Sequence, residues 1–147
     1  FEEATMRAAA FGLTLTAMLL PAFMGPAAVA APDPGAFDGT WDVLALCPAE
    51  NGALGYNLRF TAEVKAGVLH GLYGTEGKAS SMTLDGTIQP DGTATFAAKG
   101  LTGETFYTNA KPATPYGYDV TATFKGSRGS GTRVGGTRTC NYTFVRH

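Results

Sequence analysis

The stretch that decides the fold is YNLRFTAEVK, residues 56–65. Its apolar side chains occupy every second position, and the positions between them carry Asn, Arg, Thr, Glu or Lys. Successive side chains of a β-strand point to opposite faces, so a period of two is typical of a strand with one buried and one solvated face. The stretch therefore predicts an antiparallel strand of a β-domain.

The same alternation continues on the C-terminal side of this stretch. Residues 80–89 and 116–126 repeat it, and they are rich in Thr and aromatic residues, which favour pleated sheets. Turns containing glycine separate the runs, among them Ala66-Gly67 and Pro90-Asp91-Gly92. No segment after the first thirty residues has the pattern of a helix long enough for a globular core. Eight strands are predicted, over residues 39–47, 55–65, 68–74, 80–89, 93–100, 103–109, 116–126 and 137–146.

Residues 1–30 are predicted to be a signal peptide with a short upstream extension, and not part of the fold. Met6-Arg7 opens the signal, residues 8–24 are almost wholly apolar and uncharged, and Ala28-Val29-Ala30 has the small-x-small pattern of a cleavage site. The alternative is that signal peptidase does not cleave this segment, which then remains as a membrane anchor. Proline and glycine residues near the end of the apolar run count against a membrane-spanning helix. Cleavage would place the protein in the periplasm or outside a bacterial cell.

The rest of the chain is predicted to be a Pro- and Gly-rich tether, residues 31–36, and a single domain, residues 37–147. This part is electrically balanced: it has ten Lys and Arg, the chain's 11 less Arg7, and ten Asp and Glu, the chain's 12 less Glu2 and Glu3. A general binder of nucleic acid or anionic membranes would carry a marked basic excess. We therefore expect no nucleic-acid partner and, after cleavage, no stable membrane span.

The two cysteines, Cys47 and Cys140, indicate how the strands are arranged. In an oxidising compartment an even, minimal number of cysteines predicts a disulfide. Cys47 shares the phase of Trp41 on the first strand and Cys140 that of Tyr142 on the last, so both should point inward. A disulfide needs its Cα atoms within about 7 Å, which makes the first and last strands neighbours. The sequence thus predicts an all-β, eight-stranded antiparallel up-and-down barrel, with a two-sheet β-sandwich as the alternative.

Residues that could carry catalysis or bind a metal are few and scattered. The histidines are His70 and His147, and with both cysteines in a disulfide a zinc site lacks ligands. His70 is the only candidate base for a nucleophile–base pair. The carboxylates are scattered along the sequence, so two of them would form a catalytic pair only if the fold happened to bring them together. We expect no catalytic residue, no metal and no cofactor.

The most unusual segment is KGSRGSGTRVGGTR, residues 125–138. It is only loosely similar to a phosphate loop, because the phosphate-gripping lysine is missing and no helix follows. In one interpretation, a glycine-rich hairpin gathers backbone N–H groups into an anion-binding nest beside Arg128 and Arg133. Arg138 is a further candidate contact for an anion or a partner. In the other interpretation, the segment is a flexible, solvated loop.

Most of the aromatic residues are expected on the inward faces of the strands, where they would form the core. Small inward residues, such as Gly86 and Ala98, either make room for these rings or leave a cavity for a ligand. Both alternatives are open.

Phe37-Asp38-Gly39-Thr40-Trp41 opens the first strand with Gly-x-Trp. This resembles the opening motif of the calycin barrels: lipocalins, avidins and the small bacterial metalloprotease inhibitors. The resemblance implies that Trp41 plugs one end of the barrel and that an arginine near the last strand, Arg138 or Arg146, packs across it. The middle of the chain shows no lipocalin or avidin signature, and a disulfide between first and last strands departs from the usual arrangement of the bacterial inhibitors.

The same opening, together with Asp91-Gly92, residues 126–133 and Cys140, resembles an uncharacterised small exported β-domain of α-proteobacteria. That family has no established activity, so the resemblance implies a fold and a compartment but no function. We expect a non-enzymatic binding module that recognises a small molecule or a protein partner. The alternative is an inhibitor of a secreted or foreign hydrolase, acting through its N-terminal tether or a loop.

Overall fold

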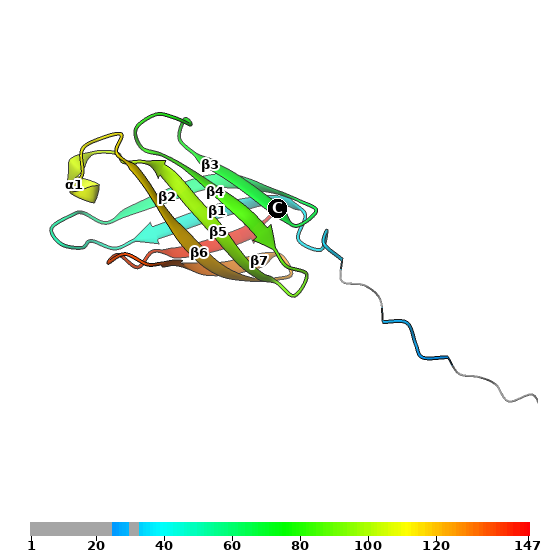
Figure 1. Ribbon diagram of the computed structural model, residues 1–147. Coiled ribbons are helices and arrows are strands. Elements are labelled where there is room, and N and C mark those ends of the chain that lie inside the picture. Colours follow the sequence, from blue (N-terminus) through cyan, green and yellow to red (C-terminus); the bar gives the residue numbers. More distant parts are fainter. Residues whose placement is uncertain (1–24, 30–32) are drawn as a thin grey trace, which may run out of the picture. The chain divides into compact units, whose positions relative to one another are not determined.

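The computed structural model describes residues 25–29 and 33–147, and its β-domain is a closed barrel of antiparallel strands in sequence order (Figure 1). β1 closes the barrel by pairing with β8, from Trp41 opposite Arg146 to Leu46 opposite Asn141. The predicted up-and-down barrel is confirmed, and the closed sheet excludes the sandwich alternative. The strands are β1 Gly39–Cys47, β2 Tyr56–Lys65, β3 Val68–Tyr73, β4 Ser81–Ile88, β5 Thr93–Leu101, β6 Pro115–Lys125, β7 Arg128–Val134 and β8 Asn141–Arg146.

The predicted signal peptide lies outside the described residues, apart from residues 25–29. Those residues have no regular secondary structure and form part of a unit separate from the barrel. Among the described residues, no helix has the length and hydropathy that crossing a membrane requires.

Two segments differ from the prediction. Residues 103–109, predicted to be a strand, belong to a loop that contains the short helix α1 Thr105–Thr108. The glycine-rich segment supplies the missing strand instead, because β7 pairs with both β6 and β8. The inward positions of β7 are Gly129, Gly131 and Arg133, so the strand lacks the apolar alternation by which strands are recognised in a sequence. The predicted number of strands is right, but one of them is assigned to the wrong segment, and the solvated-loop interpretation of residues 128–134 is wrong.

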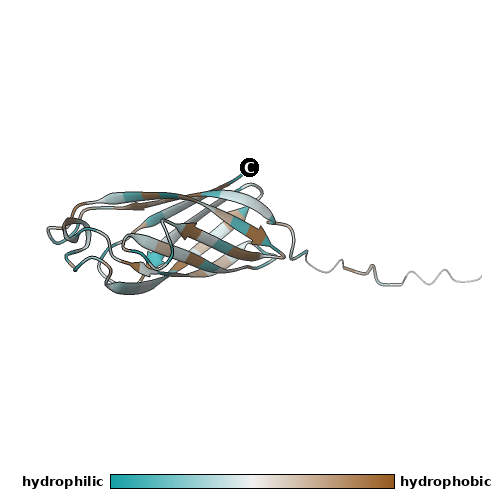
Figure 2. Ribbon diagram, turned by 90° about the horizontal axis from the view of Figure 1, so that it is seen from above, coloured by the Kyte–Doolittle hydropathy of each residue, from teal (hydrophilic) through white to brown (hydrophobic). Residues whose placement is uncertain are grey.

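Aromatic rings fill the half of the barrel in which β1 begins. Phe124 lies near the middle of the group, with ring-centre distances of 5.2 Å to Trp41, 4.9 Å to Phe144 and 6.0 Å to Phe96. All four side chains are buried, and edge-to-face contacts of this kind add to the stabilisation from burial. Hydrophobic and hydrophilic residues alternate along the strands that surround them (Figure 2).

Inward glycines make room for these rings. Gly86 lies directly opposite Phe96 on the neighbouring strand, and Gly129 lies opposite Phe124. A Cβ atom at Gly86 would come within 2.8 Å of the Phe96 ring, and one at Gly129 within 2.6 Å of the Phe124 ring. Each ring therefore covers the backbone of its glycine partner. Here the small inward residues accommodate rings and do not form a cavity.

The end of the barrel at which β1 begins is closed. Trp41 is fully buried there, and its Nε1 donates a hydrogen bond to the carbonyl oxygen of Phe37 at 2.9 Å. The Cζ atom of Arg146 lies 5.3 Å from the centre of the Trp41 ring system. Its Nη1 also donates to the carbonyl oxygens of Ala36 (3.0 Å) and Asp38 (3.1 Å). Of the two arginines considered, Arg146 is therefore the one that packs across the tryptophan.

Long loops gather at the opposite end, while short turns join the strands at the closed end (Figure 1). The disulfide between Cys47 and Cys140 also lies at the open end, where it joins the last residue of β1 to the residue before β8 with a Cα–Cα distance of 4.3 Å. The predicted disulfide is confirmed. Loops on a rigid scaffold commonly carry binding residues. The four loops of this end comprise residues 48–55, 74–80, 102–114 and 135–140.

Candidate binding site at the open end of the barrel

Two adjoining hollows occupy the open end of the barrel. One has a volume of about 410 Å³ and the other of about 420 Å³. Both volumes are within the range of about 300–1,000 Å³ that is typical of small-molecule sites. The hollows share the lining residues Tyr56, Thr102, Tyr107, Thr108 and Tyr116.

The hollows exist because strand pairing stops short at this end. β3 pairs with β2 only along Ala62–Lys65, so within the described barrel residues 56–61 of β2 have no strand partner on that side. β7 ends at Val134, opposite Asp119, so the described residues provide no partner strand there for residues 115–118 of β6. The inward side chains of these two segments therefore have no neighbouring strand beside them on one side. They include Tyr56, Leu58, Tyr116 and Tyr118, which are half-buried and line the hollows.

Arg133 faces the second hollow from β7. Its Cζ atom lies 4.1 Å from the centre of the Tyr118 ring, a cation–π contact. Its Nε is buried and has no hydrogen-bond partner among the described residues, and none of the ion pairs in that part of the chain includes Arg133. A buried donor without a partner costs about 1–3 kcal/mol, so a hydrogen-bond acceptor placed at this nitrogen would be favourable.

The phenol groups beside Arg133 are neutral near pH 7. The hydroxyl oxygens of Tyr118 and Tyr142 lie 2.7 Å apart, and that of Tyr118 is 3.6 Å from the sulfur of Met82. Burial, reinforced by neighbouring tyrosines, raises the pKa of Tyr116 and of Tyr118. Burial also raises the pKa of Tyr142 to about 12. The formal charges among the lining residues are therefore those of Glu50, Arg133 and Arg138.

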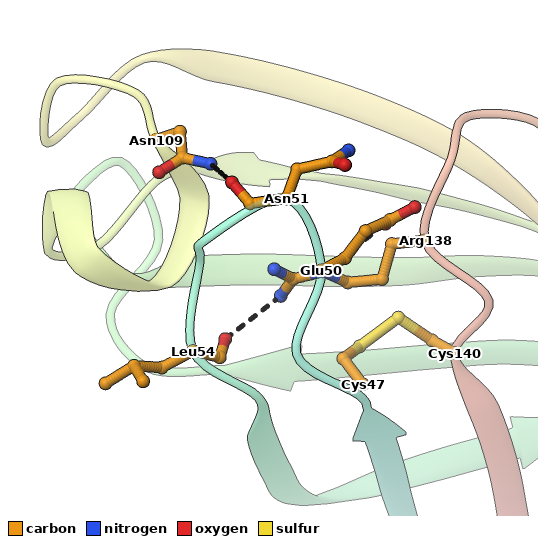
Figure 3. Close-up of polar contacts among 7 residues, drawn as sticks. All are labelled: Cys47, Glu50, Asn51, Leu54, Asn109, Arg138 and Cys140. Carbon is orange, nitrogen blue, oxygen red and sulfur yellow. Dashed lines mark hydrogen bonds and ion pairs between the residues drawn. A yellow bond between two sulfur atoms is a disulfide. The ribbon is translucent and has the colours of Figure 1, made fainter.

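Arg138 joins two of the loops at the rim (Figure 3). Its Nη1 donates to the carbonyl oxygen of Leu54 at 3.4 Å, and its Nε lies 4.0 Å from a carboxylate oxygen of Glu50. Its Cζ atom is 5.2 Å from the centre of the Tyr56 ring. Cys140 is two residues away, so the disulfide anchors the loop that carries this arginine. Arg138 therefore has acceptors of its own, and Glu50 offsets its charge.

Helix α1 and the 48–55 loop form an apolar rim beside the hollows. Phe106 is 51% exposed and Leu54 is 54% exposed. The backbone N–H of Leu54 donates to the carbonyl oxygen of Phe106 at 2.8 Å. The side-chain amide of Asn109 donates to the carbonyl oxygen of Asn51 at 3.0 Å (Figure 3). These two hydrogen bonds hold the rim in place although its large side chains are exposed.

The structure does not bring the arginines of the glycine-rich segment together. Arg128 begins β7 near the closed end and is exposed, whereas Arg133 faces inward near the open end. The rise of an extended strand puts about 17 Å between their Cα atoms. The backbone between them pairs with both neighbouring strands, so its N–H groups do not converge into an anion-binding nest.

His70 and Trp41 lie away from the open-end hollows. His70 is exposed on β3, where its Nδ1 contacts a carboxylate oxygen of Asp85 on β4. Trp41 plugs the closed end. In the described part of the chain, no group of three or more His, Cys, Asp and Glu side chains could hold a metal ion.

Sequence reasoning missed the tyrosine-lined hollows, although part of the signal was present. Tyr56, Tyr116 and Tyr118 fall on the inward phase of predicted strands, at the ends that lead into long loops. Tyrosine combines an apolar ring with a polar hydroxyl and suits such half-buried positions. Arg133 could not be given an inward position because β7 was not predicted to be a strand.

Comparison of the chain with protein-family models, with curated proteins and with solved structures finds no significant match. The resemblance to calycin barrels and to the α-proteobacterial domain stays a prediction. The proposal about function is therefore based on the barrel and on the residues at its open end.

Proposed function

We propose that the protein is an exported, non-enzymatic binding module that takes a small organic molecule into the open end of its barrel. The observation that carries this proposal is the pair of adjoining hollows of about 410 and 420 Å³, which share a lining of tyrosine and threonine side chains. A disulfide is typical of proteins outside the cytoplasm, and it supports a periplasmic or secreted location.

The chemistry of the lining favours recognition over catalysis. Glu50 is the one carboxylate among the residues that line the two hollows, and none of those residues is a histidine or a cysteine. A carboxylate oxygen of Glu50 lies 4.0 Å from the Nε of Arg138. The remaining polar groups are hydroxyls, amides and guanidinium groups, which orient a ligand by hydrogen bonds.

One half of the barrel forms a packed core, and the other half presents a binding surface. The closed half is filled by aromatic rings, with Phe96, Phe124 and Phe144 fully or almost fully buried. The open half presents half-buried rings on strands that this core and the disulfide hold in place. A binding surface ordered before the ligand arrives has little entropy left to lose on binding.

The proposal can be tested with a neutral, environment-sensitive probe, phenylnaphthylamine, titrated into the protein. We expect saturable fluorescence enhancement at a single class of site. The variant Leu58→Trp should block the first hollow, which Leu58 lines, and weaken binding at least about tenfold. Its control is Leu46→Trp, because Leu46 faces outward on the neighbouring strand and is 45% exposed.

The two variants separate filling of the hollow from a general effect of the added tryptophan. Circular dichroism and thermal melting check that both are folded. If the wild-type protein shows no saturable binding, or if both variants bind as the wild type does, the proposal is wrong.

A second candidate, inhibition of a secreted or foreign hydrolase, is favoured by the apolar rim. Phe106 and Leu54 are about half exposed, and the hydrogen bond between their backbones fixes them side by side. Large exposed apolar side chains in an ordered setting suit protein docking. Under this candidate the wild type inhibits a member of a panel of secreted proteases and glycosidases, and Phe106→Ala relieves the inhibition. Inhibition that Phe106→Ala leaves unchanged would exclude the rim as the docking surface.

A further inference from the structure

Three arginines of the barrel domain each lie over an aromatic ring, and they differ in the acceptors that their nitrogen atoms meet. Arg146 lies over Trp41, Arg138 over Tyr56 and Arg133 over Tyr118. Arg146 donates to backbone carbonyl oxygens, and Arg138 donates to a carbonyl oxygen and lies beside a carboxylate. Arg133 has a buried Nε for which the described residues supply no acceptor.

We infer that the open end selects organic anions: Arg133 binds the anionic head of a ligand whose flat, apolar body lies against the neighbouring tyrosine rings. This inference rests on the proposed function and names the class of molecule that the site takes. The head would be a carboxylate or a chemically similar oxyanion, such as a phosphate monoester.

The choice of an anion follows from the charges around Arg133. A guanidinium group is planar and always protonated, and its N–H groups match the oxygens of a carboxylate or phosphate in pairs. Glu50, the one carboxylate that lines the hollow, lies at Arg138 and forms no ion pair with Arg133. A phenol with its ordinary pKa of about 10 is neutral at pH 7, and burial raises the pKa of Tyr116 and of Tyr118 further. The lining residues therefore leave the charge of Arg133 without a counter-charge.

The choice of a flat, apolar body follows from the walls of the hollows. The rings of Tyr116 and Tyr118 are nearly parallel, with an interplanar angle of 15°. Tyr56 and Tyr107 also line the hollow and form an edge-to-face pair, with ring centres 6.0 Å apart. Aromatic faces and edges favour ring-containing ligands through stacked and edge-to-face contacts. The apolar side chain of Leu58 extends the wall in the first hollow.

The experiment uses two fluorescent probes that share one ring system. Anilinonaphthalene sulfonate carries an anionic head, and phenylnaphthylamine is the same body without it. A hydrogen bond to a charged group contributes about 1.5–3 kcal/mol, so we expect the anionic probe to bind at least about tenfold more tightly to the wild-type protein. Naphthoate and naphthyl phosphate should displace it, and naphthalenemethanol should do so at least about tenfold less well.

The variants then assign the preference to one residue. Arg133→Gln should lose the anion preference, bringing the two dissociation constants within about twofold of each other. Arg133→Lys keeps the charge without the planar pair of donors and should retain part of the preference. The matched control is Arg128→Gln on the outer face of the same strand, which should behave as the wild type does.

The outcomes distinguish this inference from the function on which it rests. If phenylnaphthylamine binds and the sulfonate binds no better, the open end is a binding site but the inference about anions is wrong. If Arg133→Gln keeps the full preference in a folded protein, Arg133 is not the recognition residue and the inference is wrong again. If neither probe binds, the proposed function and the inference both fail. Competition by naphthoate but not naphthyl phosphate, or the reverse, identifies the head group within the supported class.

Discussion

Truncation of Trp41 to alanine tests whether this side chain plugs the closed end of the barrel and stabilises the fold. The side chain is fully buried, and Trp→Ala changes at such positions cost about 3–5 kcal/mol. The carbonyl oxygen of Phe37 would also lose the hydrogen bond from Nε1, at about 1 kcal/mol. Loss of the contact with Arg146 adds about 0.5–1 kcal/mol. We expect the free energy of unfolding to fall by about 4.5–7 kcal/mol.

That loss is comparable with the whole stability of a typical domain, which is about 5–15 kcal/mol. Trp41→Phe is therefore the more informative variant, because it keeps a ring against Phe124 and removes the N–H donor. We expect it to cost about 1–3 kcal/mol, from the lost hydrogen bond and the smaller ring. Leu46→Ala on the same strand is the control; Leu46 faces outward and is 45% exposed, so its truncation should cost under about 1 kcal/mol.

Urea unfolding followed by far-ultraviolet circular dichroism measures these differences. Tryptophan fluorescence cannot follow all of them, because the chain has one tryptophan and both Trp41 variants lack it. Slopes that are equal between variants would show that the changes lie in stability and not in the compactness of the unfolded chain. A loss below about 1 kcal/mol for Trp41→Ala would refute the conclusion that the ring plugs the barrel.

Three further predictions concern the disulfide, the tyrosines and the N-terminus. Replacing Cys47 and Cys140 with alanine together should lower the free energy of unfolding by about 4–5 kcal/mol in urea melts, because the bond closes a loop with a sequence separation of 93; an unchanged stability would contradict this. Stability should fall above about pH 10, since Tyr116, Tyr118 and Tyr142 have raised pKa values in the fold and ionise first in the unfolded chain, whereas below about pH 9 these tyrosines do not change it. Each contributes a slope of up to about 1.4 kcal/mol per pH unit, so Tyr142→Phe should make the alkaline fall shallower, and an equally steep fall in that variant would count against the assignment. N-terminal sequencing of exported protein should give a start at or near Ala31 or Pro32, and a start at Met6 would overturn cleavage.

The fold could be predicted from the sequence wherever one face of a strand is apolar. β2 is the clearest case, because every inward position carries an apolar or aromatic side chain. The pattern misleads at residues 103–109, where Phe106 and Tyr107 look like strand residues but lie on a helical turn and are 51% and 36% exposed. It fails at β7 for the opposite reason: the ring that fills the space inside Gly129 belongs to Phe124 on β6, and no inward position of β7 carries an apolar side chain.

The candidate site could be predicted only in part, because it depends on where strand pairing ends. The inward phase of Tyr116 and Tyr118 follows from the alternation along one strand. That a hollow lies beside them depends on β7 ending at Val134, opposite Asp119, and on β3 pairing with only part of β2. Such ends are set by how far the pairing of each hairpin extends away from its turn. The periodicity of a single strand contains no information about them.

The arginines at the two ends of the barrel differ in their hydrogen-bond acceptors. This difference bears on the function of the open end. At the closed end, the segment before β1 brings the carbonyl oxygens of Ala36 and Asp38 to Arg146, so chain and arginine together seal the barrel. At the open end, the loops meet each other through Arg138 and the disulfide, and no carbonyl or carboxylate of the described residues reaches the Nε of Arg133. A buried, unmatched donor lowers stability, and the cation–π contact with Tyr118 offsets part of that cost. Under the inference drawn above, a bound anion would give the guanidinium group of Arg133 the counter-charge that the lining residues do not supply.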